Sequence, residues 1–214
     1  MKIVWLKGDY TGKNKERQRQ AEKERCDIVI EFHFNSAGDK AASGTEVWHR
    51  QYSMSSRHLA SILHDRITAL GFKPRGVKSA VPTSRASFIN SYPTTCIVVL
   101  LEPCFVSNRS DAEKLHQDGF MDKLASAIAS GIQDFLKTVI YKKFVVIGLS
   151  VGHKYKTSNP NDKGAACVFG DWEADHAEDL ARKVAKLLQS KNSQRKEVPG
   201  EMARRKRAKK SKGA

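Results

Sequence analysis

The sequence lacks several features that mark well-known classes of protein. No apolar run reaches the roughly 18–20 residues of a membrane-spanning helix. The apolar stretch between Met1 and Asp9 is too short for a signal peptide, so we expect a protein made in the cytoplasm without a Sec-type export signal. The chain has neither a Cys-x-x-Cys pair nor a His-Glu-x-x-His motif, the strongest sequence signatures of zinc ribbons and of many zinc peptidases.

Cysteine is also scarce. The four cysteines are scattered along the chain, at Cys26, Cys96, Cys104 and Cys167. In a chain without an export signal we expect free, mostly buried thiols rather than disulfides.

What the chain does have is enough apolar sequence for a core and a very uneven charge. Its 214 residues are 40% hydrophobic, which suits one domain of ordinary size. The net charge is +15, of which the ten basic and two acidic residues of 191–214 supply +8. We therefore predict a folded body over 1–190 and a basic tail over 191–214, disordered or helical only on binding. Such a tail would meet an anionic envelope surface: lipopolysaccharide, phospholipid headgroups or wall polymers.

Hydrophobic periodicity predicts alternating strands and helices. Strands are expected at Ile3–Leu6, Cys26–Phe34, Thr45–Arg50, Thr94–Leu101 and Phe144–Leu149, and helices at Lys13–Arg25, Ser56–Leu70, Phe120–Leu136 and Ala174–Leu188. A capping box at Ser110–Glu113 predicts one more short helix. Alternation of this kind indicates an α/β three-layer sandwich, with a mostly parallel or mixed sheet of about five or six strands flanked by helices.

Polar residues follow three of the predicted strands. His33 lies at the end of the second strand, Glu102 follows the fourth and His153 the fifth, while Glu173 lies in the first turn of the last helix. Carboxyl ends of parallel strands form sites. Two histidines and a carboxylate are a common ligand set for catalytic zinc, and zinc hydrolases use a further carboxylate as general base. From composition alone this is a weak signal.

Longer motifs carry a resemblance. Segment 27–48 (DIVIEFHFNSAGDKAASGTEVW) resembles the "SIHxN…GxEv" motif of zinc-dependent N-acetylmuramoyl-L-alanine amidases of the third amidase family, a type found in cell-wall and phage lytic enzymes. Segment 100–115 (LLEPCFVSNRSDAEKL) is similar to "vExGFxSNxxDxxxL" of the same family. Segment 145–188, which begins VVIGLSVGHK, resembles that family's opening "DPGHGGxxxGAxG…E", and residues 15–26 its helix before the histidine strand. Together the matches cover roughly residues 3–190.

The order of these motifs departs from the family. Its opening segment comes last here, so the chain reads as a circular permutant whose usual first strand and helix lie at 143–190. Because chain termini are often close in space, a short link such as Thr138–Lys143 permits this rearrangement. The resemblance implies that His153, Glu173 and His33 hold one Zn²⁺ ion and that Glu102 is the catalytic glutamate.

Smaller departures and alternatives stay open at this stage. Lys154 replaces a family glycine, and Pro103-Cys104 follows Glu102 in place of the usual residues. The polar loop Tyr155–Lys163 is somewhat long for the family.

Glu31, two residues before His33, is a candidate partner or competing carboxylate, and His176 a candidate alternative ligand. A Cys104 nucleophile is conceivable, although no orienting group is visible. We expect Glu46 to be structural or a rim contact, and we expect surface positions for the remaining histidines, His49, His58, His64 and His116.

The resemblance implies an enzyme that cuts the bond between N-acetylmuramic acid and L-alanine in peptidoglycan. Without an export signal, the expected biology is a phage-type endolysin that waits in the host cytoplasm and acts on the wall after release. One alternative is a zinc peptidase that cuts the stem peptide. Another is a nucleic-acid-binding protein that uses the basic tail, but the terminal run of charge argues against specific nucleic-acid recognition. We expect a monomer.

Overall fold

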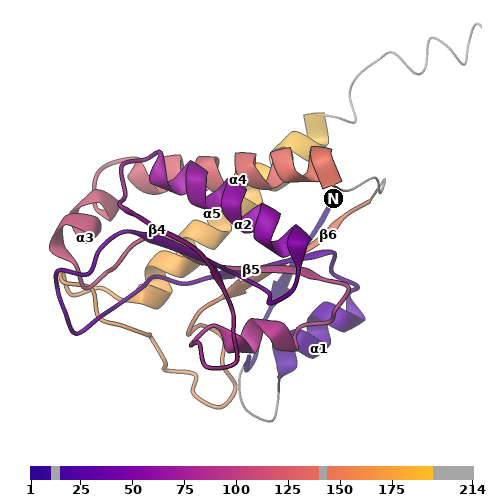
Figure 1. Ribbon diagram of the computed structural model, residues 1–214, viewed down its shortest axis with the longest axis horizontal. Helices are drawn as coiled ribbons and strands as arrows, with labels where there is room; N and C mark the ends of the chain where they lie inside the picture. Colours follow the sequence, from indigo (N-terminus) through magenta and orange to yellow (C-terminus); the bar gives the residue numbers. More distant parts are fainter. Residues whose placement is uncertain (11–14, 140–143, 195–214) are drawn as a thin grey trace, which may run out of the picture.

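The computed structural model describes residues 1–10, 15–139 and 144–194 (Figure 1). Its strands are β1 (Lys2–Leu6), β2 (Ile28–Phe32), β3 (Thr45–His49), β4 (Pro74–Ser79), β5 (Ile97–Glu102) and β6 (Val146–Val151). Its helices are α1 (Glu16–Lys23), α2 (Met54–Thr68), α3 (Arg109–Leu115), α4 (Phe120–Val139) and α5 (Glu173–Gln194), with a 3₁₀ turn η1 at Ser87–Ser91.

The six strands form one mixed sheet in the order β1-β6-β2-β5-β3-β4. Neighbouring pairs from β1 to β5 are parallel, β5 and β3 are antiparallel, and β3 and β4 are parallel again. The last strand in the sequence, β6, is therefore an interior strand between β1 and β2. Four adjacent strands end at one edge of the sheet, and that edge carries the polar residues described below.

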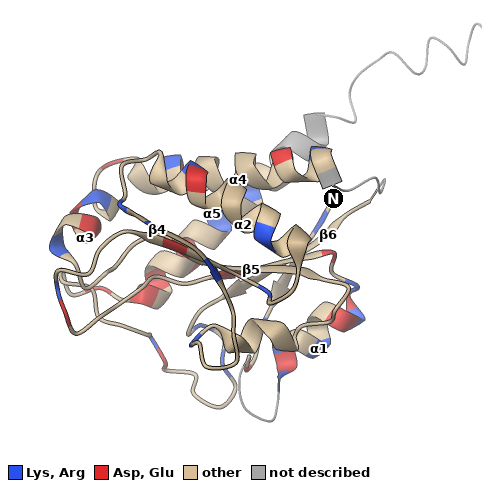
Figure 2. Cartoon of the chain, viewed as in Figure 1, with Lys and Arg blue, Asp and Glu red and all other residues tan. Residues whose placement is uncertain are grey.

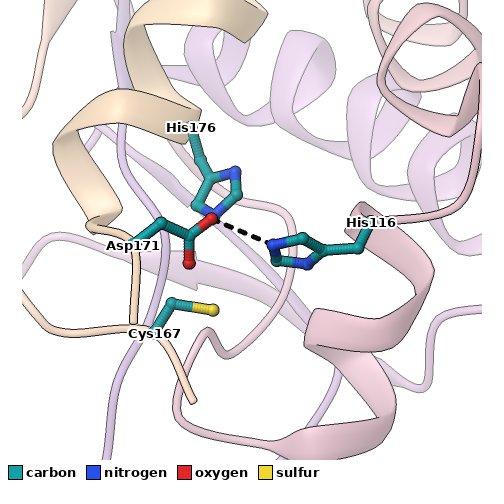
Figure 3. A group of neighbouring side chains, drawn as sticks. All are labelled: His116, Cys167, Asp171 and His176. Carbon is teal, nitrogen blue, oxygen red and sulfur yellow. Dashed lines mark hydrogen bonds and ion pairs between the residues drawn. The ribbon is translucent and has the colours of Figure 1, made fainter. Parts of the chain in front are cut away.

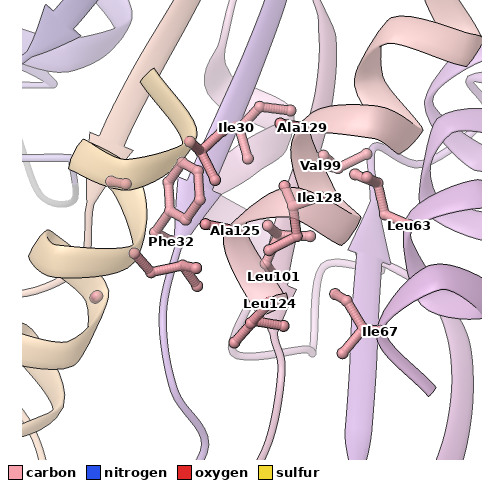
Figure 4. Close-up of a cluster of buried hydrophobic side chains, with 14 of the residues drawn as sticks. Ile30, Phe32, Leu63, Ile67, Val99, Leu101, Leu124, Ala125, Ile128 and Ala129 are labelled. Carbon is pink, nitrogen blue, oxygen red and sulfur yellow. The ribbon is translucent and has the colours of Figure 1, made fainter. Parts of the chain in front are cut away.

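Helices cover both faces of this sheet, which confirms the predicted α/β sandwich (Figure 1). Helices α2, α4 and α5 form one layer, and α1 lies with η1 on the other side. The larger core lies under the three-helix layer, where Ile30 and Phe32 of β2 and Val99 and Leu101 of β5 meet Ile128 of α4 (Figure 4). These side chains alternate along each strand with residues of the second core, as the two-residue period of a strand requires.

Strand β4 was not predicted from the sequence. Its segment, PRGVKS, contains proline and glycine, which are depleted in strands, and two basic residues. Pro74 stands at the first position of an edge strand, one of the few places where a missing backbone N–H is tolerated. Tertiary pairing with β3 overrides the weak local preference here.

Two of the shifted helix boundaries have a clear structural meaning. Helix α3 begins one residue before the predicted capping box, because Asn108 and not Ser110 is the N-cap: its side chain accepts from the Asp111 N–H at 3.1 Å. Helix α5 continues to Gln194, beyond the predicted tail boundary at 190/191. Residues 195–214 of the predicted tail lie outside the described residues.

Two histidines expected at the surface are buried. His64 accepts the Gly76 N–H at 3.1 Å, and His49 contacts the Arg50 carbonyl through Nδ1 at 2.7 Å. The polar sequence around these histidines did not predict their burial. Their rings are buried because β4 and the residue after β3 supply hydrogen-bond partners. The cysteine prediction is confirmed, since all four thiols are free and buried.

Charge in the described body is mixed in sign. In the view of Figure 2, Lys and Arg positions alternate with Asp and Glu over the helices and loops. Among the described helices, none is long and apolar enough to cross a membrane.

Candidate active site

The edge of the sheet formed by the ends of β6, β2 and β5 gathers the predicted polar residues. His33 follows β2 directly, and its backbone N–H donates to the Leu101 carbonyl of β5 at 3.0 Å. Glu102 is the last residue of β5. On the other side of β2, Gly152 donates to the Phe32 carbonyl at 2.8 Å, which fixes the position of His153. Because the three strands are parallel neighbours, their ends lie together.

Three of the predicted residues converge on one point. Glu173 Oε1 lies 3.1 Å from His33 Nδ1 and 3.4 Å from His153 Nε2. His33 and Glu173 are buried, and His153 is a quarter exposed. One donor atom from each of the three side chains lies within 4.8 Å of the others. Ligand atoms of a tetrahedral zinc ion are roughly 3.3 Å apart, given bonds of about 2.0–2.1 Å. The spacing and the donor types therefore fit a zinc ion.

Two glycines make room for this cluster. A Cβ at Gly152 would lie 2.4 Å from the His33 ring, and one at Gly164 would lie 2.7 Å from both Glu173 Oε2 and the His153 ring. Gly164 also has φ +70°. His153 itself has a left-handed backbone with φ 63°, a conformation that is uncommon outside glycine and often found at functional sites.

Asp162 orients His153. Its carboxylate oxygens lie 3.0 and 3.1 Å from His153 Nδ1, which leaves Nε2 directed at Glu173. Hydrogen bonding of the far nitrogen to a carboxylate is the common way in which proteins fix a metal-binding imidazole. Burial alone would raise the pKa of Asp162, but hydrogen bonds from Lys156, the Gly164 N–H and His153 lower it to about 2.

The cluster is strongly coupled electrostatically. Burial acts to raise the pKa of Glu173, yet hydrogen bonds with His153 and His33 outweigh it and hold that pKa well below its usual range. Burial acts to lower the pKa of His153, and Glu173 and Asp162 together reverse this and raise it. His33 Nε2 is buried and has no hydrogen-bond partner. A buried imidazole nitrogen without a partner among the described residues calls for a further partner, such as water, substrate or a cation.

Glu102 lies close enough to this cluster for its carboxyl group to interact electrostatically with Glu173. Its Oε2 is buried without a hydrogen bond. Burial, reinforced by the nearby Glu173 carboxylate, raises the pKa of Glu102 well above its usual value, and Arg85 opposes the rise. Arg85 is held 3.2 Å from Asn35 Oδ1. A buried carboxyl group that is free to exchange a proton suits a general acid or base.

The alternatives left open by the sequence are now placed. Glu31 is fully buried, receives a hydrogen bond from the Tyr92 hydroxyl and lies 4.0 Å from Arg17, and it is not part of the three-residue cluster. His176 belongs to a different group of side chains. Burial raises the pKa of the Cys104 thiol well above its usual value, which disfavours a thiolate nucleophile.

Sequence reasoning missed Asp162 and Arg85. Asp162 lies in the polar loop between His153 and Glu173, and Arg85 lies in the segment after β4. Arg85 belongs to no predicted element or motif. Asp162 lies within segment 145–188, but in the loop Tyr155–Lys163, where no spacing rule could place its side chain.

The comparison with protein families decides the relationship. Residues 3–134 match the family described as N-acetylmuramoyl-L-alanine amidase. The chain belongs to this amidase family. The matched range contains His33 and Glu102 but ends before His153 and Glu173.

Individual members of this amidase family are similar over a comparable range. LytC, an N-acetylmuramoyl-L-alanine amidase of Bacillus subtilis (strain 168), is 30% identical over 125 residues, or 57% of this chain and 24% of LytC. The endolysin of Bacillus phage SPP1 is 29% identical over 126 residues, or 56% of this chain and 44% of the endolysin. The chain thus spans less than half the length of either relative.

Among solved structures, the catalytic domain of the amidase CwlV from Bacillus (Paenibacillus) polymyxa var. colistinus is 27% identical, with a TM-score of 0.50. That likeness covers 59% of this chain and 66% of the CwlV domain. The agreement supports the α/β fold of this amidase-family chain.

Proposed function

We propose that this protein is a zinc-dependent N-acetylmuramoyl-L-alanine amidase, which hydrolyses the amide bond between N-acetylmuramic acid and L-alanine in peptidoglycan. The observation that carries the proposal is the convergence of His33, His153 and Glu173 beside the unpartnered carboxyl group of Glu102. Two of these four residues lie inside the family match and two lie outside it, yet the fold brings them to one site.

His33, His153 and Glu173 would hold one Zn²⁺ ion, with the fourth position open to water or substrate. Zinc in such a site polarises a carbonyl oxygen and makes water nucleophilic near neutral pH. The chain's own contribution is to fix the ligands. Asp162 orients His153, and the backbone N–H groups of Phe34 and Ala165 lie 3.3 and 3.1 Å from the two oxygens of Glu173.

Glu102 would move the proton. As water adds to the carbonyl carbon, the carboxylate of Glu102 accepts a water proton. It then donates that proton to the amide nitrogen as the carbon–nitrogen bond breaks. The products are the lactyl carboxylate and a free L-alanine amine. The raised pKa of Glu102 suits this double role, because its carboxyl group must hold a proton between the two steps.

The chain order is best explained by circular permutation. Strand β6 and helix α5 would be the family's first strand and helix, moved to the end of the chain. Two observations support this: β6 is an interior strand between β1 and β2, and the segment beyond the family match supplies two of the three side chains proposed to bind the metal. Because a metal site depends on the positions of its ligands in space, their order along the chain is immaterial.

As its biological role we propose that of an endolysin, held in the host cytoplasm and active on the wall after release. Similarity to the SPP1 endolysin supports this role. The catalytic domain would be residues 1–190, acting as a monomer. The +8 charge of 191–214 would bring the enzyme to an anionic envelope surface. A zinc peptidase acting on the stem peptide would use the same site chemistry, so the product bond decides between the two.

Mass spectrometry of digested peptidoglycan tests the reaction. We expect free L-alanine amino termini and intact glycan strands, lost with a chelator and restored by zinc. Cleavage inside the stem peptide would replace the amidase by the peptidase. No cleavage by a folded, zinc-loaded sample would reject both.

A matched pair of variants tests the role of Glu102. We expect Glu102→Gln to lower the rate about 10²–10⁴-fold, since general acid–base catalysis contributes about that much, with zinc binding retained. Glu113→Gln is the control, because Glu113 is an exposed carboxylate on α3 that pairs with Arg109, and the variant should keep its activity. A Glu102→Gln protein as active as wild type would contradict the mechanism.

A further inference from the structure

A second group of potential metal ligands lies apart from the site described above. It consists of His116, Cys167, Asp171 and His176, and one donor atom from each lies within 4.8 Å of the others (Figure 3). His116 follows α3, Cys167 and Asp171 lie in the loop before α5, and His176 is in the first turn of α5. The group therefore joins three segments that are separate in sequence.

The two histidines aim at one carboxylate oxygen. His116 Nε2 lies 3.0 Å from Asp171 Oδ2, and His176 Nε2 lies 2.8 Å from the same atom. His116 Nδ1 contacts the Ala112 carbonyl at 2.8 Å. A carbonyl only accepts, so Nδ1 is the donor in that contact, and Nε2 is the ring nitrogen that faces the cluster. This is the orientation that a metal-binding imidazole requires.

Hydrogen bonding alone leaves this group incompletely satisfied. His176 Nε2 is buried and lacks a hydrogen bond of good geometry despite its short distance to Asp171. The Cys167 thiol belongs to the same group as the Asp171 carboxylate, and the Cys167 N–H donates to the Asp171 carbonyl at 2.8 Å. A bound metal ion would satisfy the orphaned nitrogen and replace the thiol proton, since a coordinating thiol is deprotonated outright.

We propose that His116, Cys167, Asp171 and His176 bind a second Zn²⁺ ion with a structural role. Two imidazole nitrogens, one thiolate sulfur and one carboxylate oxygen are all established zinc donors, and four protein ligands close the coordination shell as structural sites do. Tetrahedral zinc ligands lie roughly 3.3–3.8 Å apart, a spacing within the span of this group. The side chains of His116 and Asp171 are 38% and 36% exposed, which gives the ion a path from solvent.

The position of this site explains what it would do. His176 lies one helical turn after Glu173 on α5, and Cys167 and Asp171 close the loop that leads into that helix. A metal ion bound here would tie this loop and the start of α5 to the end of α3. It would thereby fix the turn that carries Glu173. The proposal does not depend on the amidase reaction.

Cobalt substitution of the full-length protein tests the second site directly. Among the residues of the two clusters only Cys167 is a thiol, so a thiolate-to-cobalt charge-transfer band in the near ultraviolet reports this site alone. We expect the band in wild type and its loss in Cys167→Ser. Cys96→Ser is the matched control, because Cys96 is a buried thiol in the other hydrophobic core, and it should keep the band.

Zinc content measured by elemental analysis provides the second readout. We expect two equivalents in wild type, one in Cys167→Ser and one in His33→Ala, and we expect the cobalt band to persist in His33→Ala. If Cys167→Ser does not fold, His116→Ala replaces it, because that exposed side chain can be removed without opening the core.

The proposal is overturned if wild type shows no charge-transfer band with cobalt in excess. It is also overturned if the band survives Cys167→Ser, or if zinc content is unchanged in both Cys167→Ser and His116→Ala. Failure of peptidoglycan cleavage with the band intact would reject the amidase proposal and leave the second site standing.

Discussion

The segment that matches the amidase family and the segment that follows it contribute to the molecule in different ways. Residues 3–134 supply five of the six strands, together with His33 and Glu102. Residues 144–194 supply one strand and one helix, together with His153 and Glu173. The shorter segment nevertheless occupies the interior of the sheet, because β6 lies between β1 and β2.

In this protein, the position of a segment along the chain does not determine its position in the sheet. In the sheet, β1 joins the other strands through β6, although about 140 residues separate the two along the chain. The matched segment alone contains two residues of the candidate site, His33 and Glu102. The other two, His153 and Glu173, belong to the segment that also supplies β6.

The largest effect is expected from removing the second segment. A chain that ends at residue 139 loses, among other buried residues, six large buried apolar side chains: Ile147, Leu149, Val151, Leu180, Val184 and Leu188. Each contributes about 1.5–3 kcal/mol, so their sum of roughly 9–18 kcal/mol is comparable to the whole stability of about 5–15 kcal/mol of a typical domain. We expect no cooperative thermal unfolding transition by circular dichroism.

Two further chains sharpen that result. A chain that ends at Gln194 keeps every described residue and should melt as the full chain does. The second is a circularly permuted chain in which residues 144–194 come first. A ten-residue Gly/Ser linker, which spans up to roughly 33 Å, joins them to Met1. We expect this chain to fold and to bind zinc. A cooperative transition in the chain that ends at 139 would contradict the dependence of the sheet on β6.

Gly152→Ala tests the contact between the two segments at the site itself. The added Cβ would lie 2.4 Å from the His33 ring and would displace it. We expect roughly 10²-fold lower activity and weaker zinc binding, since misplacement by about 1 Å can cost that much. Gly38→Ala is the control, because a Cβ there meets nothing within 4 Å. Equal zinc affinity in both variants would show that His33 is not held as described.

Asp162→Asn tests how the His153 ring is oriented. The amide keeps the size of the side chain but loses the charge that faces His153 Nδ1. We expect zinc affinity to fall about 10–100-fold, the usual effect of removing such a partner, together with some loss of thermal stability, because Asp162 also accepts from Lys156 and the Gly164 N–H. Competition with a chromophoric chelator measures the affinity. An unchanged affinity would assign Asp162 to loop structure only.

The smallest effect concerns the matched segment alone. Glu46 is 2.7 Å from both Arg75 and Lys78, and these hydrogen bonds outweigh burial and lower its pKa. The pKa of Glu46 in the folded protein lies below the usual 4.5. Its ion pairs therefore stabilise the protein fully above pH 4.5, and this stabilisation is lost as the pH falls from 4.5 through the lowered pKa. We expect Glu46→Gln to cost about 1 kcal/mol near neutral pH.

Chemical denaturation over a pH series measures this difference between wild type and Glu46→Gln. The two stabilities should converge below the usual carboxyl pKa near 4.5. A gap that grows towards acid pH would contradict the lowered pKa of Glu46.

Local pattern predicted most of the elements but not their ends. Strands β1, β2, β3, β5 and β6 and helices α2, α4 and α5 follow from hydrophobic runs and helical spacing, and their observed bounds shift by a few residues. Strand β4 escaped because an edge strand with proline and glycine carries no strand-like pattern. The burial of His49 and His64 was not predicted either, because residues from distant parts of the chain surround these side chains.

The sequence by itself determined the α/β class, the family, and which polar residues follow which strands. These depend on short patterns: alternating apolar runs, and motifs around His33, Glu102 and His153. Only the tertiary structure decided that β6 enters the sheet beside β1, that Asp162 faces His153, and that His116 meets Cys167, Asp171 and His176. The physical reason is that these contacts join residues that no single helix or strand links, and their distances are set by the packing of the sheet, its helices and its loops rather than by local conformational preference.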